Sequence, residues 1–196
     1  ELYQTVQPGL QELFDTQQPV FLSTSSAWGV MEGAIRNLTS KGVLNCMCGA
    51  FSDKWHDVSK RCGKEATALR FEWGKPVDPE IVRKELSSGA YDTITLVHNE
   101  TSTGVTSDIT AVRNVMDELR HPALLMVDTI SSLASIDYKH DEWGVDVTIG
   151  GSQKGLMLPP GLSFNAISNK ALQIHETAKM NRSYWDWTAM LAANKN

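Results

Sequence analysis

A lysine and an aspartate follow two segments that have the apolar pattern of buried strands. Lys154 comes shortly after residues 145–150, beyond a stretch of mostly small residues, and Asp128 ends the run 124–128. Their separation of 26 residues is close to one β-crossover-β unit, so both side chains should emerge at the same edge of a parallel sheet. Because Lys154 has small neighbours and other backbone close by, we expect it to be poorly hydrated, which favours a neutral amine that can form an imine.

An amine and a carboxylate in one crevice suit pyridoxal phosphate. Lys154 would hold the aldehyde of this cofactor as a Schiff base, and Asp128 would keep the pyridine nitrogen protonated so that the ring can act as an electron sink. A lysine after a strand is more often a solvated loop residue. The cofactor hypothesis therefore requires further residues that could hold the phosphate and the ring.

A serine-containing turn could supply the phosphate site. Residues 25–29 (Ser-Ser-Ala-Trp-Gly) follow a short strand at 20–22 and open a helix. Backbone N–H groups at the start of a helix bind a dianion well, and the helix dipole favours it. The alternative is that a serine here is an ordinary N-cap of the helix.

Three motifs occur in a fixed order along the chain. They are residues 98–104 (His-Asn-Glu-Thr-Ser-Thr-Gly), 127–132 (Val-Asp-Thr-Ile-Ser-Ser) and 151–154 (Gly-Ser-Gln-Lys). With them the sequence resembles the class V pyridoxal-phosphate aminotransferases, and most of all the serine/alanine–glyoxylate (serine–pyruvate) group. The resemblance runs through nearly the whole chain. It implies transamination between a small amino acid, serine or alanine, and a 2-oxo acid, glyoxylate or pyruvate, with Lys154 and Asp128 as catalytic residues.

The resemblance also implies how the phosphate is held. Ser26, Ala27 and Trp28 occupy the phosphate loop of the family, which usually has glycine and then threonine or histidine at the last two of these positions. Backbone contacts to the phosphate would survive this difference. A hydroxyl contact from position 28 would not.

Further positions match cofactor contacts of the family. Trp55 matches the aromatic residue that stacks on the ring, although a tryptophan there could also pack in the core. Thr101 matches a hydroxyl near the phenolic oxygen, Ile130 would cover the ring face opposite Trp55, and Gln153 precedes the catalytic lysine. His98 could act as a general base, but the freed lysine already moves the proton in this chemistry.

Two alternatives stay open. Cysteine desulfurases and related lyases tend to carry histidine before the lysine and another histidine where Trp55 stands; neither is present here, so a lyase is the weaker hypothesis. The chain could instead be an inactive, isolated cofactor-binding domain. The amino-terminal segment and small carboxyl-terminal domain of the family would lie outside residues 1–196, with the substrate-binding arginine and the phosphate contacts across a homodimer. We therefore expect a large domain that binds pyridoxal phosphate weakly by itself, with an exposed apolar patch at Tyr184, Trp185, Trp187 and Met190.

Composition and charge exclude several other classes. The 196 residues are 41% hydrophobic, enough for one sizeable core and a single domain. A net charge of −5 argues against binding to nucleic acid. The sequence has no basic cluster that would bind a membrane surface and no apolar run of ~20 residues that would cross a bilayer. Cys46, Cys48 and Cys62 lack the histidines or second cysteine pair of a metal site. We expect them to be reduced core thiols in a cytoplasmic protein, with no bound metal.

Strand and helix patterns alternate along the chain. Strand-like runs fall at 20–22, 43–48, 68–73, 93–98, 124–128, 145–150 and 162–167, the last of them expected to be antiparallel. Helical spacing of apolar residues falls at 2–16, around 31–38 and near 52–63, 78–88 and 108–120. This alternation predicts an α/β fold with a mostly parallel seven-stranded sheet and helices on both faces. The resemblance implies the same architecture, the large domain of fold-type I pyridoxal-phosphate enzymes.

Overall fold

A seven-stranded sheet forms the centre of the molecule in the computed structural model, which describes residues 2–194. In spatial order the strands are β1 (Val20–Ser23), β9 (Ser163–Ile167), β8 (Val147–Gly151), β7 (Leu124–Asp128), β4 (Thr93–Val97), β2 (Gly42–Met47) and β3 (Glu65–Arg70). Only β9 runs against the others, because it pairs antiparallel with both β8 and β1. The predicted α/β fold, the strand number and the reversed last strand are confirmed.

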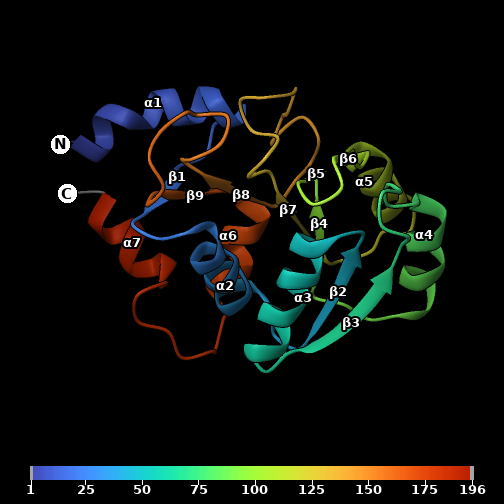
Figure 1. Cartoon of the computed structure of the whole chain (residues 1–196). Coiled ribbons are helices and arrows are strands. Elements are labelled where there is room, and N and C mark those ends of the chain that lie inside the picture. The colour runs from blue at the N-terminus through green and yellow to red at the C-terminus, as the bar shows by residue number, and fades with distance from the viewer. Residues whose placement is uncertain (1, 195–196) are drawn as a thin grey trace.

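Helices cover both faces of this sheet (Figure 1). One face carries α2 (Ala27–Leu38), α3 (Ala50–Arg61), α6 (Asn169–His175) and α7 (Trp187–Asn194). The other carries α1 (Leu2–Phe14), α4 (Pro79–Ser88) and α5 (Ile109–Glu118). Along β7, alternate residues enter the two hydrophobic clusters, Leu124 and Met126 on the first face and Leu125 and Val127 on the second. Burial on both faces explains why this strand is a continuous apolar run.

A few boundaries differ from the prediction. Strand β3 begins at Glu65, three residues earlier than expected, and α6 and α7 were not predicted. A short hairpin, β5 (Asn99–Glu100) and β6 (Val105–Thr106), follows β4. The three cysteines are free and buried, as predicted.

The predicted apolar patch near residue 187 is wrong in part. Tyr184 is exposed, but Trp187 is only 1% exposed and packs in the core. Trp185 lies against α2, where a Cβ atom added to Gly29 would come within 2.6 Å of its ring. Sequence spacing could not reveal this packing, because it depends on a helix more than 140 residues earlier in the chain.

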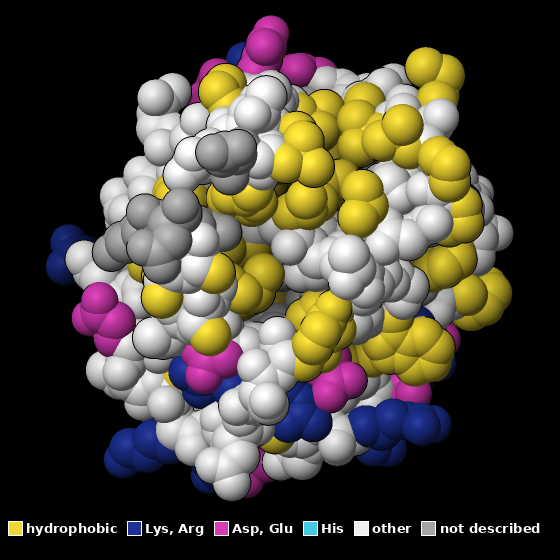
Figure 2. All heavy atoms as spheres, turned by 90° about the vertical axis from the view of Figure 1, so that its left-hand side faces the viewer, with side chains coloured by type: hydrophobic (Ala, Val, Ile, Leu, Met, Phe, Trp, Pro, Cys, Tyr) yellow, Lys and Arg dark blue, Asp and Glu magenta, His cyan; other side chains and the backbone are white. Residues whose placement is uncertain are grey.

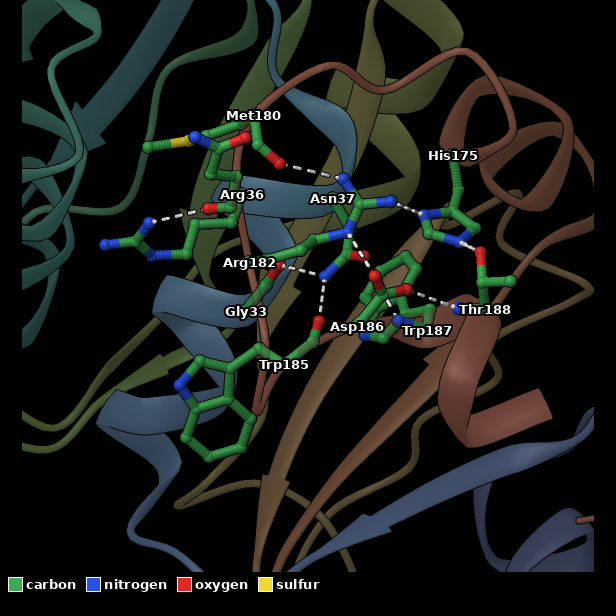
Figure 3. Close-up of polar contacts among 11 residues, drawn as sticks. Gly33, Arg36, Asn37, His175, Met180, Arg182, Trp185, Asp186, Trp187 and Thr188 are labelled. Atoms are coloured by element: carbon green, nitrogen blue, oxygen red, sulfur yellow. Dashed lines mark hydrogen bonds and ion pairs between the residues drawn. The ribbon is translucent and has the colours of Figure 1, made fainter. Parts of the chain in front are cut away.

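Polar contacts fix this segment to α2 (Figure 3). The side-chain amide of Asn37 donates to the carbonyl oxygens of Gly33 (2.7 Å) and Trp185 (2.6 Å), and its oxygen accepts the N–H of Trp187 (3.3 Å). At the same cluster, His175 contacts the hydroxyl of Thr188 at 2.8 Å. Residues 185–188 thus fix the helix that begins at the predicted phosphate turn.

Hydrophobic side chains gather on the face where α1 and α7 lie (Figure 2). On α1, Leu2 and Val6 are exposed, and a shallow pocket lined by Tyr3, Pro8 and Leu191 lies where the two helices approach each other. Within residues 2–194, no helix has the length and apolar character needed to cross a membrane.

Candidate active site

The carboxyl ends of β4, β7 and β8 meet at one edge of the sheet. Asp128, the last residue of β7, lies beside Val97 of β4 and Ile149 of β8. Next to this edge is a cavity of about 430 Å³, a size that suits a small cofactor. Its wall contains every predicted site residue except Trp55: Ser26, Ala27, Trp28, Thr101, Asp128, Ile130, Gln153 and Lys154. These eight residues come from four separate stretches of the chain, and the sheet brings them together.

A larger cavity of about 630 Å³ lies at the opposite edge, where the strands begin. It is lined by Arg36, Lys64, Asp92 and Lys179, among others, and contains none of the predicted site residues. We therefore assign the chemistry to the smaller cavity at the carboxyl edge, where ligands of open α/β sheets bind.

Asp128 is the buried acid of the site. It is 3% exposed, and its Oδ1 accepts the N–H of Ile130 at 2.8 Å. Burial raises the pKa of this carboxyl to about 7, the nearby charge of Glu100 adds to the rise, and the Ile130 hydrogen bond partly offsets it. A carboxylate kept from water and short of donors is a strong acceptor for a cationic N–H group. This environment fits a protonated pyridine nitrogen.

Lys154 lies in the turn after β8, and here the sequence expectation was wrong. Its side chain is exposed rather than poorly hydrated. The reason is that the turn projects from the sheet edge, and small neighbours leave the amine uncovered. The turn itself is well fixed: Met157 N–H donates to the Lys154 carbonyl at 2.9 Å, and the Ser152 hydroxyl donates to the Pro159 carbonyl at 2.6 Å. Gly155 allows this path, because a Cβ atom there would lie 2.2 Å from the Leu133 carbonyl oxygen.

The turn before α2 is open to an anion. Ser26 is the N-cap residue, yet its side chain makes no capping hydrogen bond. Trp28 is 44% exposed, and the Lys54 ammonium lies 3.2 Å from the centre of its ring. Helix start, free hydroxyl and nearby cation form a donor set that fits a phosphate group. Sequence reasoning missed Lys54, whose position one turn into α3 gave no signal by itself.

Of the two aromatic residues in the first half of α3, Phe51 lines the cavity and Trp55 does not. Trp55 is 1% exposed and packs in the core between α3 and the sheet. Phe51 lies one turn earlier in the same helix, is 42% exposed and lines the cavity. Four residues of helix span about 6 Å, so Trp55 lies too deep below the sheet edge to reach the cavity. Trp55 therefore does not line the cavity in this structure, and the identity of the residue that stacks on a cofactor ring stays a prediction.

Of the two remaining predicted residues, Thr101 lies at the cavity and His98 lies in the core on the other face of the sheet. The Thr101 hydroxyl lies at the cavity, hydrogen bonded to the hydroxyl of Ser131. His98 is 4% exposed and packs against Tyr138 and Trp143 in the core on the other face. Burial lowers the pKa of His98 to about 4. It is a neutral core residue, so the general-base alternative finds no support.

The fold of this chain is shared with solved aminotransferases. The alanine–glyoxylate aminotransferase of Nostoc sp. superposes with a TM-score of 0.90 at 29% identity, over 96% of this chain and 51% of that one. The aspartate aminotransferase of Thermus thermophilus gives 0.89 at 32% identity, over 99% and 54%. These similarities identify the chain as an aminotransferase-type α/β domain.

Sequence comparison gives the family. Residues 45–184 match the family described as Aminotransferase class-V. The L-aspartate–glyoxylate aminotransferase of Paracoccus denitrificans is 45% identical over 87% of this chain and 44% of its own length. The serine–glyoxylate aminotransferase of Arabidopsis thaliana is 38% identical over 97% and 49%. The chain belongs to the class-V aminotransferase family and spans about half the length of these relatives.

Proposed function

We propose that the full-length protein is a pyridoxal-phosphate-dependent aminotransferase that transfers the amino group of serine, alanine or a similar small amino acid to glyoxylate or pyruvate. The observation that carries this proposal is the cavity that joins Lys154, Asp128 and the open start of α2. The names of the relatives support glyoxylate as the acceptor. A homodimer and a cytoplasmic location stay predictions, as does the weak binding and inactivity of residues 1–196 alone.

Bound pyridoxal phosphate would supply an aldehyde that exchanges with amines and a ring that withdraws electrons from the substrate. Lys154 would attach to the cofactor through Nζ. The same Nζ, when free, would act as the base that moves a proton at the substrate α-carbon. Asp128 would hold a proton on the ring nitrogen.

Other residues of the cavity would position the cofactor. The backbone N–H groups and hydroxyl at Ser26, Ala27 and Trp28 would bind the phosphate, with added positive charge from Lys54. Phe51 and Ile130 would cover the two faces of the ring. Gln153 and Thr101 would contact its polar edge.

The proposal is tested by profiling donors and acceptors on the full-length protein. Serine, alanine and aspartate are each paired with glyoxylate and pyruvate, and the keto-acid and amino-acid products are measured. We expect the highest turnover with glyoxylate. Release of sulfur from cysteine without amino transfer would instead assign a desulfurase-like lyase.

Phe51 and Trp55 should respond differently to truncation. Phe51→Ala should weaken cofactor affinity roughly 3- to 10-fold, because an aromatic stack contributes about 0.5–1.5 kcal/mol, and should leave the fold nearly unchanged. Trp55→Ala should instead lower the free energy of unfolding by about 3–5 kcal/mol through the core cavity it leaves. Fluorescence titration with the cofactor and urea unfolding of both variants check this pair. If Trp55→Ala instead weakens cofactor affinity and Phe51→Ala mainly lowers the free energy of unfolding, Trp55 is the stacking residue.

A further inference from the structure

Glu100 is a fully buried carboxylate to which the proposed reaction gives no role. It is 0% exposed and lies in the hairpin after β4, directly before Thr101. Its Oε1 accepts hydrogen bonds from the Phe51 N–H (3.2 Å), the Ser102 N–H (3.2 Å) and the Ser102 hydroxyl (2.7 Å). Its Oε2 accepts from the Ser52 N–H (3.0 Å) and hydroxyl (3.2 Å). Three backbone N–H groups and the Ser102 hydroxyl therefore compensate the buried charge, as a carboxylate in the interior requires, while the Ser52 hydroxyl shares its one hydrogen with the Gly49 carbonyl (2.9 Å).

These contacts cap the start of α3. The N-cap residue is Gly49, which has no side chain to offer an acceptor. Glu100 accepts the amides of Phe51 and Ser52, and the Ser102 hydroxyl accepts that of Ala50 at 3.0 Å. A negative charge at this end also complements the helix dipole. The cap comes from a residue 49 positions away from Phe51, so it ties the helix directly to the hairpin.

Gly49 makes room for the side chain of Glu100 at the start of α3. A Cβ atom added to Gly49 would lie 2.4 Å from Cγ of Glu100 and 2.6 Å from its Cδ. Any larger residue would push the carboxylate away from the helix. Gly49 and Glu100 thus form one fitted pair.

Two helices begin near the cavity, and their first turns differ. The start of α2 has a serine whose side chain makes no capping bond, whereas the start of α3 is filled by Glu100. Phe51 sits in the first turn of α3, and Thr101 follows Glu100 directly; both line the cavity or its rim. The same carboxylate therefore holds two cavity residues and leaves only α2 of this pair open to an external anion.

We propose that Glu100 is a positioning residue of the cofactor site: its carboxylate occupies the start of α3 as an internal anion, fixes Phe51 and Thr101 against the cofactor ring, and directs the phosphate to α2. This inference rests on the proposed function. Glutamine in its place would present one oxygen and one NH2 group, so one of the two backbone amides, of Phe51 or Ser52, would face a donor instead of an acceptor.

The test compares Glu100→Gln and Glu100→Ala with the control Asp78→Ala in the full-length protein. Asp78 caps α4, where its Oδ1 accepts the Glu80 N–H at 2.9 Å, away from the cavity. Cofactor affinity, circular dichroism of the bound cofactor and unfolding in urea are measured for each. Both Glu100 variants should lose roughly tenfold or more in cofactor affinity and show a weaker cofactor signal, since bonds to a charged group are lost. Asp78→Ala should lose stability with unchanged cofactor binding.

Chemical rescue separates a lost anion from general damage. Formate added to Glu100→Ala should restore part of the cofactor affinity and signal, because it can fill the vacated carboxylate position; it should have no effect on Asp78→Ala. Unchanged affinity and signal in Glu100→Gln, with only a loss of stability, would overturn the inference. Failure of the unaltered protein to attach the cofactor at Lys154 would refute the proposed function itself, and this inference with it.

Discussion

Replacing Lys154 with alanine should abolish covalent attachment of pyridoxal phosphate and lower turnover by roughly 10⁴-fold or more, because one amine both attaches the cofactor and moves the proton. Borohydride reduction of the loaded protein followed by peptide mapping should place the cofactor on Lys154 and should find no label in the variant. Noncovalent affinity should persist in part, since the phosphate turn and Asp128 remain.

Lys54 provides the matched control for this result. It is the second lysine of the cavity, and its ammonium already contacts the ring of Trp28. Lys54→Ala should keep the label on Lys154 and weaken only the affinity for the phosphate. A label on Lys54, or normal labelling in Lys154→Ala, would contradict the assignment.

Replacing Asp128 with asparagine should cut turnover by roughly 10²- to 10⁴-fold while covalent attachment still occurs. Asparagine keeps the shape of the side chain but carries no charge to hold a proton on the ring nitrogen, so the ring withdraws electrons less effectively. Single-turnover kinetics with amino donor should show the loss in the proton-transfer step rather than in substrate binding. Near-normal turnover would remove Asp128 from the mechanism.

The same variant should change how the stability of the cofactor-free protein depends on pH. The pKa of Asp128 is raised from 3.8 to about 7, so the folded state binds this proton more tightly than the unfolded chain. The resulting stability is fully present below about pH 4 and is lost as the pH rises through 7. Above pH 7, Asp128→Asn should therefore be more stable than the unaltered protein and unfold at a higher urea concentration. The expected gain in the free energy of unfolding is roughly 4 kcal/mol, from a rise of the pKa from 3.8 to about 7.

A carboxylate with the opposite shift serves as the control for the pH dependence. The pKa of Asp108 is lowered, chiefly because it accepts the N–H of Ala111 at 2.9 Å as the cap of α5. Its stabilising effect is present above its ordinary pKa range and is lost as the pH falls. Asp108→Asn should thus lose stability at neutral pH, where Asp128→Asn gains it. Parallel pH profiles for the two variants would show that the burial of Asp128 has no energetic effect.

Much of the fold follows from local patterns in the sequence. Strands such as 124–128 are buried on both faces, which makes them continuous apolar runs that are visible without a structure. Asp128 and Lys154 follow two such runs, and parallel strands place their carboxyl ends at one edge, so their meeting could be predicted. The motifs around them also sufficed to indicate the class-V aminotransferase family.

The tertiary structure decided the features that depend on depth and on distant partners. Phe51 and Trp55 lie in the same helix, and only the height of that helix against the sheet places the first at the cavity and the second in the core. Lys154 is exposed because its small neighbours do not cover the amine, and only the tertiary structure shows whether another segment packs over the turn. Glu100 caps α3 although it lies 49 residues from Phe51 in the sequence. The sequence alone could not predict this cap, because the carboxylate and the backbone amides come together only when the hairpin packs against the helix.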